Sequence, residues 1–163
     1  GASNEIKIFK ADGTLINSWY AYNKIWTGLG VNVAAGDVNG DGEIEIITGA
    51  GVNGGPHVKI FDKTGSKLIN EFFSYETSFR GGTYVATGDT NGDGQISIIT
   101  GAGPTGQPKI KIFDYTGVMS YEWLAYKPQR NNGIRVTVAD IDNNGTAEII
   151  ALTTDVFTLS FTK

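Results

Sequence analysis

Acidic and amide side chains alternate with glycine at three places in this chain. The three segments are DVNGDGEIE (residues 37–45), DTNGDGQIS (89–97) and DIDNNGTAE (140–148). Oxygen-bearing side chains at alternate positions of a curled backbone converge on one point, and glycine permits the tight curl. Oxygens arranged in this way suit a hard cation with ligand distances of about 2.3 to 2.6 Å, which favours calcium.

The three segments differ in the residue at their ninth position. Oxygen ligands are expected at the first, third and fifth positions of each segment, namely Asp37, Asn39 and Asp41; Asp89, Asn91 and Asp93; and Asp140, Asp142 and Asn144. The ninth position holds Glu45 in the first segment and Glu148 in the third, but Ser97 in the second. We therefore expect the second site to bind more weakly and the third to resemble the first.

Other ions and other loop types fit these segments less well. Magnesium prefers a stricter octahedron with retained waters, and zinc prefers cysteine or histidine, whereas the chain has no cysteine and one histidine. An EF-hand needs a bidentate glutamate at position twelve, where the chain has Thr48, Thr100 and Ala151. The alternative is an ion-free turn in which Asx side chains bond their own backbone. Three clusters of carboxylates exceed what such a turn requires, because their repulsion costs free energy without a cation.

The acidic segments belong to an internal repeat of about 50 residues. Asp37 and Asp89 are 52 positions apart, and Asp140 follows after 51 more. In the first full unit the acidic segment is followed by ITGAG, PHVKIFDKTG and KLINEFFSY, and in the second by ITGAG, PKIKIFDYTG and VMSYEWLAY. We divide the single repeat domain, 1–163, into a half repeat (1–30), two repeats (31–82 and 83–133) and a partial repeat (134–163).

The sequence pattern of each repeat predicts four short strands. Apolar residues recur with period two, as in VNVAA at residues 31–35, and glycine-closed turns such as Asp62 to Gly65 join the runs as hairpins. No stretch has the pattern of an amphipathic helix, so the chain is predicted to be all-β. Four antiparallel strands in about 40 to 50 residues match a β-propeller blade better than a β-sandwich, which needs no such recurrence.

The predicted strands amount to about three blades, including a last strand over 156–161. A propeller closes with about four to eight blades, so either the chain belongs to a longer array or copies associate as a homo-oligomer that completes the ring. Such an arrangement would pair the N-terminal half repeat with the C-terminal unit of another copy. Residues 6–9 and 156–161 both resemble the third strand and would compete for one place.

Composition excludes several classes of function. The formal net charge is −4, which gives no positive surface field for a nucleic-acid backbone. No apolar run approaches the roughly 18 residues that a membrane-crossing helix requires, and the N-terminus lacks the basic and apolar regions of a signal peptide. Partners other than nucleic acid and membrane are therefore expected.

The acidic segments resemble the loops of the FG-GAP and VCBS type of propeller repeat, as found in integrin α-subunits and bacterial surface proteins. The glycine-alanine-glycine triplets Gly49 to Gly51 and Gly101 to Gly103 also match the family pattern, whereas the third unit departs from it at Ala151 to Thr153. The resemblance implies calcium ligation by the side chains named above and by the backbone carbonyls of Glu43, Gln95 and Thr146. It also implies an extracellular or cell-surface location.

These observations favour a non-catalytic calcium-binding module for adhesion, scaffolding or binding of a protein or glycan partner. A carbohydrate-binding propeller is the alternative, because aromatic residues recur along the predicted fourth strand of each unit: Trp19, Tyr20, Tyr22, Phe72, Phe73, Tyr75, Trp123 and Tyr126. Part of a secreted polysaccharide-active enzyme is a third hypothesis, which would need a paired acid and base in a cleft. We expect no enzymatic activity and a structural role for the single histidine, His57.

Overall fold

The computed structural model describes residues 3–26, 28–127 and 131–153, and every regular element in these ranges is a β-strand. The strands are β1 (Glu5–Phe9), β2 (Leu15–Tyr20), β3 (Val31–Gly36), β4 (Glu45–Ala50), β5 (His57–Phe61), β6 (Leu68–Phe73), β7 (Thr83–Gly88), β8 (Ser97–Ala102), β9 (Lys109–Phe113), β10 (Met119–Leu124), β11 (Ile134–Ala139) and β12 (Glu148–Thr153). The all-β prediction is confirmed. In the described ranges there is no helix that could cross a membrane.

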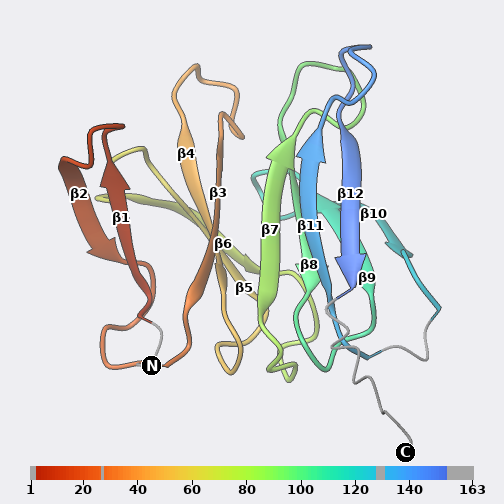
Figure 1. Cartoon of the computed structure of the whole chain (residues 1–163), viewed down its shortest axis with the longest axis horizontal. Coiled ribbons are helices and arrows are strands. Elements are labelled where there is room, and N and C mark those ends of the chain that lie inside the picture. Colours follow the sequence, from red (N-terminus) through yellow and green to blue (C-terminus); the bar gives the residue numbers. More distant parts are fainter. Residues whose placement is uncertain (1–2, 27, 128–130, 154–163) are drawn as a thin grey trace, which may run out of the picture.

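The strands form four antiparallel sheets that follow the sequence repeat (Figure 1). Two sheets have four strands each, in the orders β3-β4-β5-β6 and β7-β8-β9-β10, and the hairpins β1-β2 and β11-β12 form two-stranded sheets. The prediction of four-stranded antiparallel units is confirmed for the two complete repeats. The strand expected over 156–161 lies outside the described residues.

Equivalent residues pair in equivalent registers. Val31 pairs with Ala50 in the first complete sheet, and Thr83 pairs with Ala102 in the second. The hairpins β1-β2, β5-β6 and β9-β10 each contain a register shift near the turn. The same sequence pattern therefore produces the same backbone three times.

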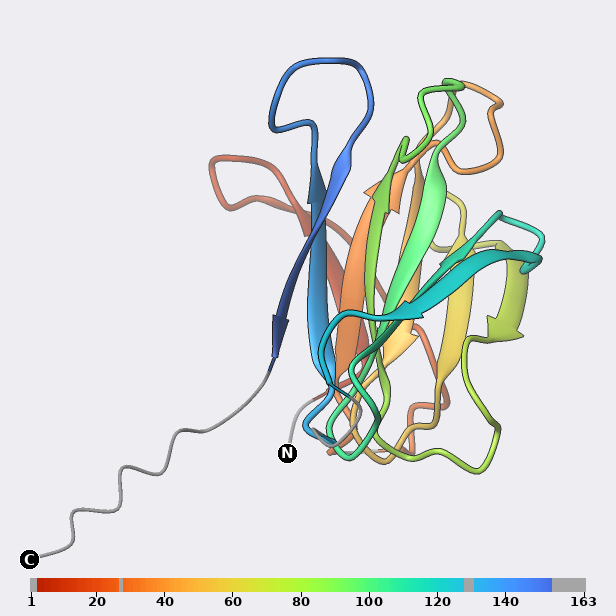
Figure 2. The same cartoon turned by 90° about the vertical axis from the view of Figure 1, so that its right-hand side faces the viewer.

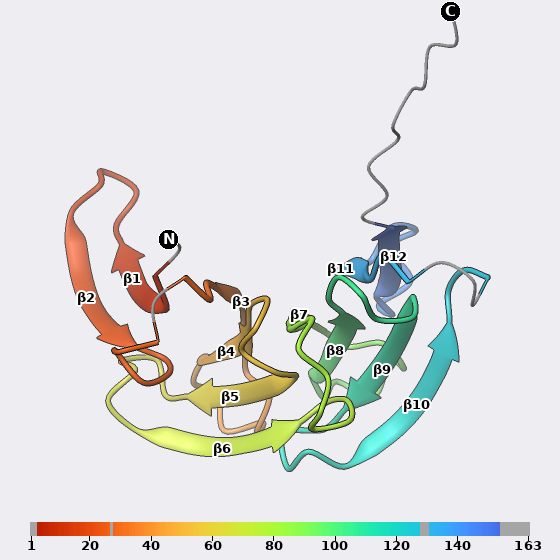
Figure 3. The ribbon, with the colours of Figure 1, turned by 90° about the horizontal axis from the view of Figure 1, so that it is seen from below.

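The sheets stand side by side and pack face to face (Figures 2 and 3). Strands β3, β7 and β11 are neighbours on the inner side of the arrangement, and β2, β6 and β10 run along its convex outer side (Figure 3). A hydrophobic cluster fills each space between adjacent sheets. Ile47 and Ile60 of one complete sheet meet Ile98 of the next, and all three side chains are fully buried. Burial of apolar area between sheets is the main stabilising term of the fold.

Small residues allow the backbones of adjacent sheets to touch at the end opposite the acidic loops. A Cβ atom at Gly49 would lie 2.4 Å from the Thr83 carbonyl oxygen of the next sheet, and one at Gly101 would lie 2.2 Å from the Ile134 carbonyl oxygen of the next. The first glycine of each glycine-alanine-glycine triplet is therefore a packing position between sheets.

The third glycine of each triplet extends the pairing within its own sheet. The N–H of Gly51 donates to the Gly30 carbonyl at 3.2 Å beside the β3-β4 pair, and the N–H of Gly103 donates to the Gly82 carbonyl at 3.0 Å beside the β7-β8 pair. A side chain at either donor glycine would stand where the backbone of the paired segment lies.

One tyrosine connects each sheet to the next, at three successive junctions. Tyr22 donates its hydroxyl hydrogen to the His57 carbonyl at 2.7 Å, Tyr75 to the Lys109 carbonyl at 2.8 Å, and Tyr126 to the Ala151 carbonyl at 3.1 Å. The sequence places these residues along the fourth strand, but in the structure each follows the end of that strand. Burial raises the pKa of Tyr22 and Tyr75, so both phenols remain protonated donors.

Candidate metal centre

The three acidic segments form loops at one end of the molecule. They connect β3 to β4, β7 to β8 and β11 to β12, and all three lie at the top of Figure 1. Successive loops are in contact: the N–H of Ala147 in the third loop donates to the Asp89 carbonyl of the second at 2.7 Å. The repeat therefore places its oxygen-rich segments in one row.

The first aspartate of each loop is held by backbone N–H groups of its own loop. Asp37 accepts from Gly42 at 2.9 Å, Asp89 from Gly94 at 2.8 Å, and Asp140 from Gly145 at 2.9 Å. For Asp89 these bonds, led by that from Gly94, hold the pKa below its ordinary value. The curl expected from the sequence is therefore present in all three copies.

The curl uses a left-handed residue at the fourth position of each loop. Gly40 and Gly92 have φ of 74° and 76°, and Asn143 takes the same conformation in the third loop with φ of 58°. Asparagine tolerates this region better than most residues other than glycine. The third loop thus keeps the backbone path although it lacks glycine there.

The third loop brings three carboxylates together. One oxygen each from Asp140, Asp142 and Glu148 lies within 4.8 Å of the others, and in the described part of the chain this is the one such group of acidic or metal-ligating side chains. Glu148, the first residue of β12, also accepts a hydrogen bond from the Ile141 N–H at 2.8 Å. Hard oxygen donors at this spacing fit a divalent cation of the calcium type.

In the first loop an amide group lies between the carboxylates. Asn39 donates through Nδ2 to Asp41 Oδ2 at 3.0 Å and to Glu45 Oε1 at 3.2 Å. Glu45 is buried, with 2% of its surface exposed, and its other oxygen accepts from the Val38 N–H at 3.0 Å. The Asn39 amide therefore presents its N–H group to both carboxylates, while its oxygen accepts from the Asp41 N–H at 2.9 Å.

The second loop keeps the curl with fewer charges. Asn91 Nδ2 donates to Asp93 Oδ2 at 2.8 Å, as its counterpart does in the first loop. Ser97 begins β8 at the place where Glu45 and Glu148 begin β4 and β12. The hydroxyl supplies no formal charge there, so this loop offers a cation two carboxylates.

Residues at the seventh position direct their side chains outside their own loop. The Glu43 carboxylate forms an ion pair with Lys63, and the Gln95 side chain lies against Gly40 of the preceding loop. Thr146 lies in the same way against Gly92. Ligation by the backbone carbonyls of these residues, which the family resemblance implies, stays a prediction.

Titration of Glu45 gives a test of this site. Burial raises the pKa of the Glu45 carboxyl, and the charges of Asp41 and Asp37 act in the same direction. Between the ordinary and the raised pKa the folded chain holds a proton that the unfolded chain has lost, so without calcium its stability falls as pH rises through that window. The Glu45→Gln variant should lack this fall when unfolding is followed from pH 4 to 7 in EGTA. If the stability of both proteins changed with pH in the same way, Glu45 would not be the group with the raised pKa.

A second set of surface features lies at the opposite end of the sheets. A cleft of about 370 Å³ is lined by Phe79, Gln107, Lys109 and Lys111, and another of about 540 Å³ by residues that include Trp26 and Asn53. Trp26 is 47% exposed and Phe79 is half-buried. His57 contacts Glu71 at 3.2 Å and stacks on Phe73.

Comparison with known proteins shows a likeness in fold to a solved structure. No family model matches the chain, and no curated protein matches it. The crystal structure of an exotype rhamnogalacturonan lyase, YesX, superposes with a TM-score of 0.57 over 91% of this chain at 17% identity. The match covers 33% of that chain, so this chain spans about a third of its length. At this identity the likeness concerns the fold alone.

Proposed function

We propose that this chain is a non-catalytic, calcium-binding module of an extracellular or cell-surface β-propeller. In this proposal the four-stranded sheets are blades, the acidic loops hold calcium, and the outer surfaces bind a protein or glycan partner in adhesion or scaffolding. The repeat period and the resemblance to FG-GAP and VCBS repeats support the architecture and the location. The convergence of Asp140, Asp142 and Glu148 carries the calcium assignment.

That convergence favours an ion site over an ordinary turn. Asp140 and Asp142 accept from the Asn144 N–H at 3.1 and 3.2 Å, as in an Asx turn. Glu148 comes from the following strand and adds a third negative charge beside them. Placing three carboxylates together is unfavourable without a neutralising cation, and calcium accepts six to eight oxygen ligands of this kind.

Isothermal titration calorimetry with calcium tests the proposal. The chain should bind calcium with a dissociation constant below about 1 mM, and the variant Asp140→Asn/Asp142→Asn should lose one binding event. Asp12→Asn, an exposed aspartate in the β1-β2 turn, is the matched control and should titrate like the parent. Absence of binding heat at millimolar calcium would remove the mechanism.

A substitution that should strengthen calcium binding at the second loop provides a complementary test. Ser97→Glu restores the ninth-position carboxylate, so calcium affinity at that loop should rise by about tenfold or more. Ser97→Gln is the matched control, because it adds comparable length without charge. Equal affinities for the two variants would show that the ninth carboxylate does not ligate.

The cleft beside Phe79 supports carbohydrate binding as a second candidate. An aromatic ring next to Gln107 and two lysines offers a stacking surface with polar donors, which is the chemistry of sugar recognition. Glycan-array binding that is lost in Phe79→Ala would support it. One protein that superposes on this chain is a lyase. The hypothesis of a polysaccharide-active enzyme would need a paired acid and base in this cleft, whose lining includes Glu76, Lys109 and Lys111.

A further inference from the structure

Five asparagines of this chain are directly followed by glycine. The pairs are Asn39-Gly40, Asn53-Gly54, Asn91-Gly92, Asn132-Gly133 and Asn144-Gly145. In such a pair the backbone nitrogen of the glycine can attack the side-chain Cγ of the asparagine, because glycine has no Cβ that hinders the approach. A hydrogen bond from that nitrogen to an acceptor opposes the attack, because the bond must first be broken. The structure therefore decides which of the five pairs is open to reaction.

In four of the five pairs the glycine N–H donates a hydrogen bond. The bonds run from Gly54 to the Gly51 carbonyl at 2.9 Å, from Gly92 to Asp89 Oδ1 at 2.7 Å, from Gly133 to the Gly106 carbonyl at 3.1 Å and from Gly145 to Asp140 Oδ2 at 2.9 Å. The N–H of Gly40 donates to no acceptor in the described part of the chain, and Gly40 is exposed. Attack on Asn39 therefore breaks no hydrogen bond of the attacking nitrogen.

A second contact activates the Asn39 side chain. Its Oδ1 accepts from the Asp41 N–H at 2.9 Å, whereas Oδ1 of the counterpart Asn91 accepts from the Asp93 N–H at 3.3 Å. Attack at Cγ moves negative charge onto Oδ1, and a fixed backbone N–H at that oxygen stabilises this charge. Both contacts favour reaction at Asn39 over Asn91, although the sequences VNGDG and TNGDG around them differ in one residue.

We propose that Asn39-Gly40 is a site of spontaneous deamidation that the folded loop leaves open. The Gly40 nitrogen loses its proton to water and forms a bond to Asn39 Cγ; the Cγ–Nδ2 bond breaks, and ammonia leaves with a proton from water. One water molecule then opens the cyclic imide at either of its carbonyl groups. The product is an aspartyl or an isoaspartyl residue at position 39, and no oxidant or reductant takes part.

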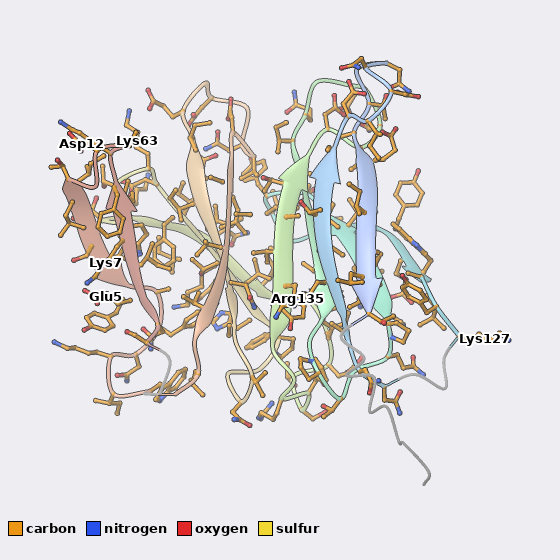
Figure 4. All side chains as sticks on the ribbon, in the orientation of Figure 1. Glu5, Lys7, Asp12, Lys63, Lys127 and Arg135 are labelled. Atoms are coloured by element: carbon orange, nitrogen blue, oxygen red, sulfur yellow. The ribbon has the colours of Figure 1, made fainter. Side chains whose placement is uncertain are left out.

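The reaction changes the charge of the first loop. In the unmodified loop the Asn39 amide hydrogens lie between the carboxylates of Asp41 and Glu45. A carboxylate at position 39 has no hydrogen to donate and adds a negative charge. Among the described residues, the ion pair of Lys63 (labelled in Figure 4) with Glu43 is the one that reaches this loop, so no cation of the chain offsets the new charge. Without calcium the modified loop is therefore less stable.

The effect of the reaction on calcium rests on the proposed function. The third loop already has an acid at this position, Asp142, and its carboxylates converge. An aspartyl product gives the first loop a further charged ligand and strengthens calcium binding, whereas an isoaspartyl product lengthens the backbone and separates the ligands. A calcium ion bound by the Asn39 oxygen holds the amide in place and slows the reaction. Molecules that lack calcium are therefore the ones that change with age.

The rate of deamidation in the folded chain tests the proposal without calcium. The chain is stored at neutral pH in EGTA, and peptide mass spectrometry measures aspartyl and isoaspartyl product at each asparagine. Asn39 should react about fivefold or more faster than Asn91, which is the factor expected from one hydrogen bond of ordinary strength. In urea both should react at the same rate. Asp89→Ala, which frees the Gly92 N–H, should bring the rate at Asn91 towards that at Asn39.

A substitution that reproduces the aspartyl product gives the second readout. Asn39→Asp should unfold at a lower urea concentration than the parent in EGTA, and calorimetry should show calcium binding at one loop that is about tenfold tighter. Asn23→Asp is the matched control, because it makes the same change of charge at an exposed residue outside the acidic loops. The control should resemble the parent in both measurements.

Two results would overturn the proposal. Equal rates at Asn39 and Asn91 in the folded chain would show that the free Gly40 N–H does not open the site, and so would an Asn39 that is still intact when Asn91 has reacted. An Asn39→Asp variant as stable in EGTA as the parent would contradict the change in loop stability. A chain that deamidates at Asn39 but shows no calcium binding by calorimetry supports the modification and rejects the calcium assignment alone.

Discussion

On the proposed calcium assignment, EGTA should lower the Tm of this chain by about 5 to 10 °C for each loop that it empties. A ligand at 100 times its dissociation constant stabilises the folded state by about 2.7 kcal/mol, and each kcal/mol shifts the Tm of a chain of this size by about 2 to 4 °C. The carboxylates released from the ion then repel one another, as the spacing of Asp140, Asp142 and Glu148 requires. Differential scanning calorimetry at fixed protein concentration measures the shift.

Matched variants separate calcium from general salt effects. Asp140→Asn/Asp142→Asn should lose the part of the EGTA shift that belongs to the third loop, whereas Asp12→Asn should keep the whole shift. Magnesium at the same concentration should restore less of the Tm, because it needs a stricter octahedron and gives up its waters reluctantly. An EGTA shift below about 1 °C, or equal recovery with both ions, would contradict calcium binding by these loops.

Replacement of Gly103 by alanine destabilises the fold by about 3 kcal/mol or more. A Cβ atom at this position would lie 1.9 Å from the Gly81 carbonyl oxygen and 2.6 Å from its carbon. Both are backbone atoms of the segment that leads into β7, the strand paired with β8 in the same sheet, so no side-chain rotation relieves the overlap. The two segments must move apart locally, which also breaks the hydrogen bond from the Gly103 N–H to the Gly82 carbonyl.

Urea unfolding of the two proteins measures this difference. Gly13→Asn is the control: Gly13 has φ of 85° in the β1-β2 turn, nothing lies within 4 Å of the position of its Cβ, and asparagine tolerates this conformation. The control should therefore change the free energy of unfolding by less than about 1 kcal/mol. A Gly103→Ala protein as stable as the parent would mean that the segments before β7 and after β8 approach less closely than these distances require.

The sequence predicted the strands and the loop curl because both depend on neighbouring residues. Period-two patterns such as VNVAA gave β3, and the acidic segments gave three loops whose first aspartate accepts backbone hydrogen bonds. A pattern that relies on glycine misses Asn143, which adopts the left-handed conformation of Gly40. The tolerance of asparagine for this conformation is the sequence signal that could have indicated it.

Features that depend on packing between sheets could not be read from the sequence. The recurrence of Tyr22, Tyr75 and Tyr126 was visible, but their carbonyl partners lie on strands that the chain reaches only after tens of residues. The orientation of the Asn39 amide depends likewise on the burial of Glu45. Such three-dimensional contacts decide whether an acidic loop brings its carboxylates together. The chemical types of the candidate ligands, in contrast, follow from residue identity.

The tyrosine contacts constrain how an array of this kind can change length. Each repeat contributes its hydroxyl donor to the unit that follows and supplies the acceptor for the unit that precedes it. Duplication or deletion of one whole period preserves every such pair, whereas an insertion of any other length leaves a donor and an acceptor unmatched. Evolution of longer or shorter relatives should therefore proceed by gain or loss of complete units of about 52 residues, with point changes accumulating inside them.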